Sequence, residues 1–414
     1  MAHAGLPKGP EIMSTRREFL GAASTAASLI GGAAASMEVG RAAPYAPGKK
    51  VRLGVVGGGF GTGFQFHEHP NCEVAAVTDL RPDRREKLRQ TYRCDTVFDS
   101  LEKMLESRTK LDAVAIFSGA PDHYRHVEMC MKRGLHTISA VPAVMSLEEA
   151  GKLKTLKERT GLRYMMAETS YYRMACIYAR NLFRQGGFGT LFYSELEYYH
   201  DGGERKRLVL DKTSRNYEPD GSRSWRWGLP PMHYPTHSLA FLVGVTGERI
   251  VETNCYGWGE GGPTLVDNRY HNPYSCQSAL MRTNRGHISR CNVFWIGGAI
   301  EERAQWFGEK GTLYMSNMDV HPDTWKNETL EMERVKIPEY WRSEMLPETM
   351  RHASGHGGSH TFLSAEFINA LIVDREPAVN IYEALAMTVP GIVAHQSSLK
   401  NGEQLKVPQF EKRA

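Results

Sequence analysis

The chain has 414 residues, of which 41% are hydrophobic and 24% are charged, and this ordinary globular composition excludes a disordered or fibrous protein. At about 150 residues per domain, the length predicts two or three domains. The formal net charge of +4 is too small to indicate a nucleic-acid partner, so we expect a small-molecule partner. The seven cysteines are scattered and include no Cys-x-x-Cys pair, which argues against a disulfide framework and against a metal site.

Residues 1–49 have the pattern of an export signal followed by a linker. The twin arginines Arg16 and Arg17 precede Phe-Leu, and residues 21–35 form a weakly apolar stretch that ends in Ala-x-Ala. This pattern predicts a twin-arginine signal and a periplasmic or otherwise exported protein. A short buried helix is the alternative, but so Gly/Ala-rich a stretch would bury little area. No later apolar run is long enough to span a bilayer, so we expect no stable membrane insertion after signal removal.

Residues 50–173 alternate short apolar runs with helical patterns. We expect strands at 51–56, 73–79, 111–117 and 136–140, and helices at 83–92, 100–107 and 122–133. Such alternation predicts a parallel sheet with right-handed crossovers, which is the doubly wound dinucleotide-binding (Rossmann) architecture of the α/β class.

A glycine run between the first strand and an expected helix predicts the cofactor site. It reads Gly57-Gly58-Gly59-Phe60-Gly61-Thr62-Gly63. Gly57 and Gly59 would let the backbone approach a pyrophosphate, and Thr62 occupies the third fingerprint position. Asp79, 22 positions after Gly57, would accept hydrogen bonds from the adenosine ribose and so favours NAD. Arg81, Arg84 and Arg85 follow closely and leave NADP possible.

Three further motifs resemble those of a known family. They are Ala120-Pro121-Asp122-His123-Tyr124-Arg125-His126, Ser139-Ala140-Val141-Pro142 and Phe307-Gly308-Glu309-Lys310-Gly311-Thr312-Leu313. In this order they resemble the Gfo/Idh/MocA oxidoreductase family from residue 50 almost to the C-terminus. The resemblance implies cofactor contacts at Pro121, His123, Val141 and Pro142. The family usually carries Glu-Lys-Pro at the second motif, with the lysine near the nicotinamide, and Val141 in its place argues against plain dehydrogenase chemistry.

The Val-Pro variation also resembles a subgroup of glycosidases on this fold, the NAD-dependent α-N-acetylgalactosaminidases. Other landmarks of that subgroup occur in order: Met165-Met166-Ala167-Glu168, Tyr171-Tyr172, His200-Asp201, Trp225-Arg226, Tyr234-Pro235-Thr236-His237 and Gly355-His356-Gly357-Gly358. On this resemblance we assign Glu168, Trp225 and Arg226 to the cofactor site. Ala140 and Ser238 depart from the subgroup, so the resemblance supports its mechanism more than its substrate.

Residues 174–385 are expected to form an α+β substrate domain. The long run at 190–200 predicts an open, mostly antiparallel sheet, whose exposed face favours a homo-oligomer. Aromatic and polar side chains cluster between residues 223 and 237, as a sugar site requires. Trp227 and Trp295 have the character of packing residues.

Oxidising a sugar hydroxyl needs a base, for which Tyr234 and His237 are the candidates. Three positions apart on an expected helix, they would face the same side. His200 is a further catalytic candidate, although with Asp201 it could form a structural hydrogen bond. His356 could cover the site or form part of a turn.

The resemblance implies glycoside hydrolysis by transient oxidation at C3, elimination, water addition and re-reduction on a tightly bound NAD. An exported enzyme would suit this cycle, because the cofactor needs no replacement. The alternatives are a net NAD(P)-dependent sugar dehydrogenase or sugar–sugar oxidoreductase, and a non-catalytic sugar- or NAD-binding protein.

The C-terminal part of the sequence predicts two helices and a turn. Residues 308–313 should form a hairpin-like turn, and residues 359–370 and 382–399 have helical patterns. We expect the last segment, residues 386–414, to pack back on the first domain.

Overall fold

The computed structural model describes residues 50–200, 210–259, 262, 265–297, 300–316 and 321–412. The predicted export signal and linker, at residues 1–49, lie outside the described residues, as does Asp201.

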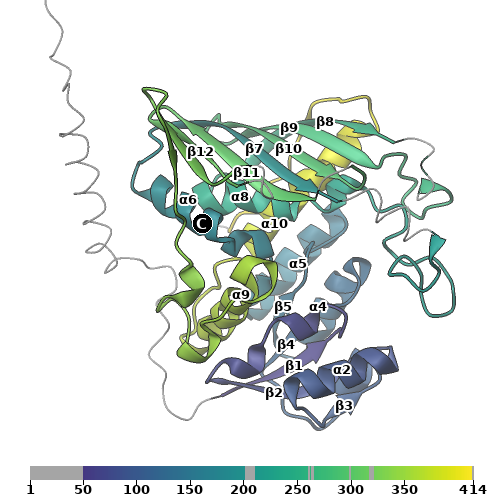
Figure 1. The fold of residues 1–414 in the computed structure, drawn as a ribbon. Coiled ribbons are helices and arrows are strands. Elements are labelled where there is room, and N and C mark those ends of the chain that lie inside the picture. Colours follow the sequence, from purple (N-terminus) through teal and green to yellow (C-terminus); the bar gives the residue numbers. More distant parts are fainter. Residues whose placement is uncertain are drawn as a thin grey trace, which may run out of the picture. The chain divides into compact units, whose positions relative to one another are not determined.

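Six of the described strands form a parallel sheet in the first half of the chain (Figure 1). They are β1 (Val51–Val56), β2 (Cys72–Thr78), β3 (Val97–Phe98), β4 (Ala113–Ile116), β5 (His136–Ser139) and β6 (Tyr164–Met166). Their order, β3-β2-β1-β4-β5-β6, is that of the Rossmann fold, which confirms the predicted fold class. Strand β4 is buried throughout, as expected for a parallel strand covered on both faces.

The helices of this half connect successive parallel strands. They are α2 (Pro82–Tyr92), α3 (Leu101–Glu106), α4 (His123–Met131) and α5 (Leu147–Thr160). The connection between β1 and β2 differs from the expectation of a helix after the glycine run, since it holds only two 3-10 turns, η2 (Gly61–Gly63) and η3 (Phe66–Glu68). Each glycine costs an α-helix about 1 kcal/mol, and Gln65 between the turns has a left-handed φ of 47°.

A second sheet contains nine of the described strands. They are β7 (Leu191–Tyr199), β8 (Ile250–Trp258), β9 (Cys276–Thr283), β10 (Ile288–Phe294), β11 (Glu301–Gly308), β12 (Gly311–Tyr314), β13 (Thr324–Asn327), β14 (Met332–Arg334) and β15 (Leu405–Lys406). Their order is β14-β13-β12-β11-β7-β10-β9-β8-β15. Only β7 and β10 pair in parallel, so the prediction of a mostly antiparallel sheet is confirmed. Strands β11 and β12 form the predicted hairpin.

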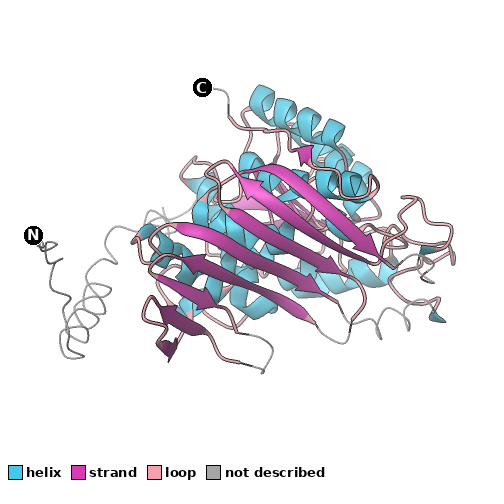
Figure 2. Cartoon of the chain, turned by 90° about the horizontal axis from the view of Figure 1, so that it is seen from above, coloured by secondary structure: helices cyan, strands magenta, loops and turns pink. Residues whose placement is uncertain are grey.

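One face of the second sheet carries helices. The helices are α6 (Met174–Arg184), α8 (Thr236–Thr246) and α10 (Ile381–Ser398) (Figure 1). Helix α8 packs against β7, β10 and β11, and its Phe241 carbonyl accepts a 2.9 Å hydrogen bond from the indole of Trp306. Figure 2 shows the opposite face of this sheet. The strand register places Tyr256, Leu280 and Ile288 on it, and all three side chains are exposed.

The C-terminal helices connect the two sheets. Helix α9 (Gly355–Ile372) contacts β1 and the 3-10 helix η5 (Thr169–Tyr172), whereas α10 contacts α5 and β6 as well as α8 and β8. The expected boundary between residues 385 and 386 therefore falls inside α10. Strand β15 pairs with β8, so the segment 386–414 also extends the second sheet.

Trp306 offers a test of the core between α8 and the second sheet. Its side chain is fully buried, so Trp306→Ala should lower the free energy of unfolding by about 3–5 kcal/mol through cavity formation. Leu280→Ala on the exposed face is the control and should change it by less than about 0.5 kcal/mol. Denaturant unfolding of both variants measures this difference, and equal losses would contradict the assigned packing.

Candidate active site

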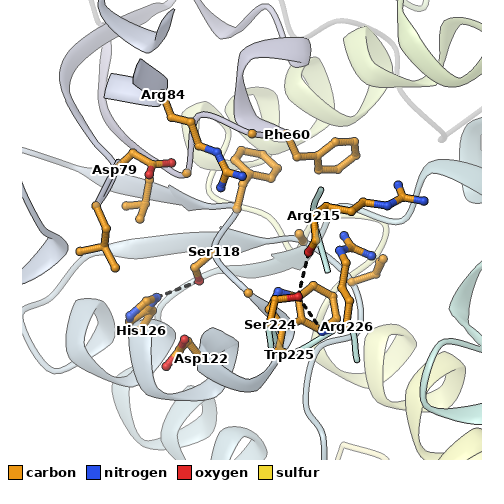
Figure 3. A pocket seen from close by; sticks show the side chains of 18 of the residues that line it. Phe60, Asp79, Arg84, Ser118, Asp122, His126, Arg215, Ser224, Trp225 and Arg226 are labelled. Carbon is orange, nitrogen blue, oxygen red and sulfur yellow. Dashed lines mark hydrogen bonds between the residues drawn. The ribbon is translucent and has the colours of Figure 1, made fainter. Parts of the chain in front are cut away.

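A cavity of about 820 Å³ extends from the glycine run of the first domain to helix α8 of the second. Its volume lies within the range of small-molecule and cofactor sites. Figure 3 shows Asp79, Arg84 and Phe60 from the first domain and Arg215, Ser224, Trp225 and Arg226 from the second around this cavity.

Gly57 and Asp79 build one end of the cavity. Gly57 has a φ of 96°, and a Cβ there would lie 2.3 Å from the carbonyl oxygen of Phe117, so only glycine fits. The Asp79 carboxylate accepts hydrogen bonds from the backbone amides of Gly58 (2.7 Å) and Arg81 (2.8 Å). These two bonds fix its position at the end of β2 and leave lone pairs on both oxygens for ribose hydroxyls.

Arginines and apolar side chains complete the cofactor end. Arg84 lines the cavity beside Gly59 and supplies a guanidinium for a phosphate group (Figure 3). Val141 and Phe60 line it farther in and present apolar surface. A carboxylate, a glycine turn, a guanidinium and an apolar wall together suit the ribose, pyrophosphate and nicotinamide of a dinucleotide.

A segment of the second domain covers this end. The indole of Trp225 lies against Gly119, where a Cβ would come within 2.8 Å of the ring. The guanidinium of Arg226 lies 4.3 Å from the centre of the Trp225 ring, and the Tyr270 hydroxyl donates to the Trp225 carbonyl (2.6 Å). Because both domains supply walls, a bound dinucleotide would be enclosed between them.

His237 lies in the first turn of α8 and forms a hydrogen-bonded pair with Glu168. Its Nδ1 is 2.8 Å from Oε1 of Glu168, a fully buried carboxylate that also accepts a 2.8 Å bond from the Ser170 amide. Burial alone lowers the pKa of His237, but the charge and hydrogen bond of Glu168 outweigh burial and raise it. Because Nδ1 donates to the carboxylate, Nε2 is the ring nitrogen that can accept a proton.

A second buried carboxylate, Glu302 on β11, lies behind this pair. It accepts hydrogen bonds from Ser170 Oγ (2.6 Å) and Arg173 Nε (2.9 Å). Burial raises the pKa of Glu302, but Arg173 overrides burial and lowers this pKa to about 2. Glu302 therefore stays ionised, and its charge adds to that of Glu168 in raising the pKa of His237.

Aromatic rings form the wall of the cavity around His237. The ring of Tyr198 lies 4.5 Å from that of His237, and its hydroxyl is 2.8 Å from Nε2 of His200. The Tyr234 ring lies 5.5 Å from His237 and 6.0 Å from Trp295. Burial raises the pKa of the Tyr234 hydroxyl, while the Arg226 guanidinium opposes this rise.

The cavity brings together most of the residues that the sequence predicts for the site. Those that line it are Gly57, Gly59, Phe60, Asp79, Arg81, Val141, His200, Trp225, Arg226, Tyr234 and His237. The described wall does not include Gly61, Thr62, Pro121, His123, Pro142 or Glu168. His123 is buried with Nδ1 2.7 Å from the Pro142 carbonyl, where it packs the 139–142 turn against α4. Glu168 is fully buried behind His237 and hydrogen-bonded to its Nδ1.

Two expectations differ from the structure in detail. Tyr234 does not lie on α8, because Pro235 is the N-cap and the helix begins at Thr236, yet Tyr234 and His237 still face one cavity. Trp295, expected to be a packing residue, donates its indole N–H to the Leu229 carbonyl (2.8 Å) and also lines the cavity. Trp227 is buried outside this cavity.

Sequence reasoning missed several residues of the wall, among them Tyr198, Arg215, Ser118 and His126. Alternation along β7 could have indicated Tyr198, which shares a face with His200. Ser118 and His126 are joined by a 2.8 Å hydrogen bond near the cofactor end (Figure 3).

In the described part of the chain, no cluster of three or more His, Cys, Asp or Glu side chains could hold a metal ion. Across those same residues, no helix combines the length and apolar character needed to cross a bilayer.

Two family models match separate parts of the chain. Residues 51–168 match the NAD-binding Rossmann fold of the Gfo/Idh/MocA oxidoreductase family. Residues 297–414 match the C-terminal domain of glycosyl hydrolase 109. The first match confirms the predicted NAD cofactor, and the two together confirm the resemblance on which the prediction rested.

Similar whole proteins agree with these matches. A glycosyl hydrolase family 109 protein from Streptomyces coelicolor is 24% identical over 97% of this chain and 94% of its own length. A glycosyl hydrolase family 109 protein from Parabacteroides distasonis is 25% identical over 96% of this chain and 97% of its own length.

Solved structures share the fold. Scyllo-inositol dehydrogenase from Lactobacillus casei, with NAD(H) and scyllo-inositol bound, has a TM-score of 0.64 at 17% identity over 86% of this chain and 99% of its own. The WlbA dehydrogenase from Bordetella pertussis, in complex with NADH and UDP-GlcNAcA, has a TM-score of 0.67 at 18% identity. The match covers 88% of this chain and 99% of that dehydrogenase.

The Glu168–His237 pair predicts a measurable change in acidity. Glu168→Gln removes the charge that raises the pKa of His237, so burial should then bring this pKa below its ordinary value near 6.5. NMR titration of the His237 ring proton measures the shift. Glu73→Gln, at an exposed position on β2, is the control and should leave the pKa unchanged. An unchanged pKa in Glu168→Gln would contradict the assigned pairing.

Proposed function

Because the chain carries the NAD-binding domain of the Gfo/Idh/MocA oxidoreductase family and the C-terminal domain of glycosyl hydrolase 109, we propose that this NAD-dependent sugar-processing enzyme is a glycosidase. In the proposed reaction the sugar is oxidised at C3, loses its C2 proton and its anomeric substituent, adds water across C1 and C2, and is reduced back. The observation that carries the proposal is the Glu168–His237 pair, whose histidine lines the same cavity as the glycine run.

Bound NAD would supply the hydride acceptor at C3 and return the same hydride at the end of the cycle. Gly57, Gly59 and Asp79 would hold its pyrophosphate and adenosine ribose, and Trp225 would enclose it from the second domain.

His237 is the proposed base for the sugar hydroxyl. Glu168 holds its Nδ1, so Nε2 is free to take the hydroxyl proton, and the buried carboxylate stabilises the imidazolium that forms. The raised pKa of His237 makes it a stronger base than an isolated buried histidine. Glu302 stays ionised behind the pair and adds to this stabilisation.

Tyr234 is the proposed second proton-transfer group. It lies on the same wall, and the Arg226 guanidinium favours its ionised form against the effect of burial. His200 and Tyr198, joined by their hydrogen bond, would position a sugar hydroxyl on the aromatic wall formed with Trp295.

The replacement of the family lysine supports a base elsewhere in the cavity. Ala140 and Val141 line the cavity, and neither side chain can take a proton. Proton transfer therefore falls to the histidine and tyrosine wall of the second domain.

We also propose export by the twin-arginine route, on the sequence pattern at residues 14–35. A cofactor that is enclosed by both domains and restored in every cycle would let the enzyme work outside the cytoplasm.

The first test is purification without added cofactor, followed by mass spectrometry, absorbance and a panel of aryl glycosides. We expect NAD to co-purify and aglycone to be released without added NAD and without net reduction of the cofactor. In heavy water, deuterium should enter at C2 of the sugar. If the bound cofactor is reduced once and turnover needs an external acceptor or a second sugar, the protein is a net oxidoreductase and the proposal is wrong.

Variants of the two proton-transfer groups test their roles. His237→Gln and Tyr234→Phe should each lower kcat by about 10²–10⁴-fold, the usual contribution of a general acid or base. Both variants should retain bound NAD. His271→Gln and Tyr256→Phe, which change exposed residues outside the cavity, are the matched controls. Unchanged kcat with weaker sugar binding would instead indicate a binding protein.

A further inference from the structure

A pair of hydrogen-bonded histidines, His356 and His360, lies at the cavity at the start of α9. His356 lines the cavity, and its Nδ1 is 2.8 Å from Nε2 of His360, which is 4% exposed. Nδ1 of His360 lies 2.9 Å from the carbonyl oxygen of Gly63. The pair thus connects the glycine run of the cofactor site to a side chain on the cavity wall.

The surroundings of His360 are shaped to hold its ring. The ring stacks on Phe64 with centres 4.4 Å apart and planes inclined by 10°. A Cβ on Gly63 would lie 2.9 Å from its Nδ1, and one on Gly355 would lie 2.5 Å from the ring. Two glycines and a stacked aromatic ring therefore leave His360 one orientation, the one that meets the Gly63 carbonyl.

The chemistry of the acceptor sets the direction of both hydrogen bonds. A backbone carbonyl can only accept, so Nδ1 of His360 carries the proton. In a neutral ring Nε2 of His360 is then an acceptor, and Nδ1 of His356 must donate to it. The lone pair of neutral His356 consequently lies on Nε2.

The backbone of His356 is held in an unusual conformation. It has a φ of 52° in the left-handed region, and Gly357 and Gly358 follow with φ values of 65° and 92°. Such a conformation is strained for a residue with a Cβ. The edge of the Phe60 ring and the bond to His360 hold His356 at the cavity in this conformation.

We propose that His360 is a positioning residue that fixes His356 as the Nδ1–H tautomer, so that Nε2 of His356 is a proton acceptor at the cavity. The proposal rests on the proposed function, for which His356 would be a further base beside His237 and Tyr234. A proton released by the sugar or by water binds to Nε2 of His356. The pair then carries one added proton and one positive charge, shared through the Nδ1–Nε2 hydrogen bond.

The charges that face the pair favour its neutral form. Burial, His360, His237 and Arg173 lower the pKa of His356 to about 4, against the opposing charge of Glu302. Burial also lowers the pKa of His360, with Arg173 acting in the same direction and the Gly63 carbonyl against it. Both rings are therefore neutral at pH 7. Two added protons would turn both nitrogens of the shared bond into donors, so the pair accepts only one.

The direct test is the tautomeric state of the two rings in the purified full chain. Long-range ¹⁵N–¹H NMR of ¹⁵N-histidine-labelled protein at pH 7 assigns which nitrogen of each ring carries hydrogen. We expect hydrogen on Nδ1 and a lone pair on Nε2 for both His356 and His360. Hydrogen on Nε2 of His356 in the neutral ring would overturn the proposal.

Variants at position 360 separate positioning from structure. His360→Phe keeps a ring to stack on Phe64 but removes both nitrogens, so His356 should lose its fixed tautomer. Its kcat should fall at least about tenfold, because general-base catalysis contributes about 10²–10⁴-fold and a misaligned base loses part of that contribution. The pKa of His356 should rise, because one of the groups that lower it is removed. His360→Gln keeps one donor and one acceptor and should retain more activity than His360→Phe.

A double-variant comparison completes the test. In a His356→Ala background, His360→Phe should have no further effect on kcat, because His360 acts through His356. Equal losses from His360→Phe in both backgrounds, with bound NAD lost, would show a purely structural role and overturn the proposal. If wild-type protein releases no aglycone, the proposed function fails, and the NMR assignment alone decides the tautomer.

Discussion

A single buried carboxylate, Glu168, is the interaction on which the arrangement of the site depends. An ionised group without a partner is costly to bury, and Glu168 is fully buried directly after β6. The Ser170 amide and His237 are the donors that satisfy Oε1, whereas Oε2 has no hydrogen-bond partner among the described residues. Helix α8 must therefore begin where His237 can reach this carboxylate. The same contact fixes the tautomer of His237. One interaction therefore both holds α8 against the segment after β6 and sets the chemistry of the site.

A second carboxylate, Glu302, extends this hydrogen-bond network into the second sheet. Ser170 donates through its backbone to Glu168 and through its hydroxyl to Glu302 on β11. Arg173 balances the two negative charges, which explains why both carboxylates can be buried so close to one histidine. A parallel sheet, a 3-10 helix and an antiparallel sheet are thus joined by one charged network, and His237 lies at its surface toward the cavity.

Local patterns in the sequence predicted the parts of the fold that depend on near neighbours. The continuous apolar runs indicated β1 and β2, and the glycine run with Asp79 indicated the cofactor end of the cavity. No local pattern indicates the hydrogen bond between Glu168 and His237, which lies 69 residues farther along the chain. The bond between Gly63 and His360 spans 297 residues. No local spacing carries such a pairing, since it is created by the way α8 and α9 pack on the first domain.

The Glu168–His237 pair and the His356–His360 pair differ in their electrostatics. This difference bears on how one cavity could serve several proton transfers. The carboxylates of Glu168 and Glu302 raise the pKa of His237 against the effect of burial. Burial, with His360, His237 and Arg173, lowers the pKa of His356 to about 4. Two bases of unequal strength in one cavity can act on protons of unequal acidity, because each proton is transferred best by a group matched to it. A hydroxyl, a carbon acid beside a ketone and a water molecule present such a range. The steps of the proposed cycle therefore require bases of different strength, and these two environments supply them.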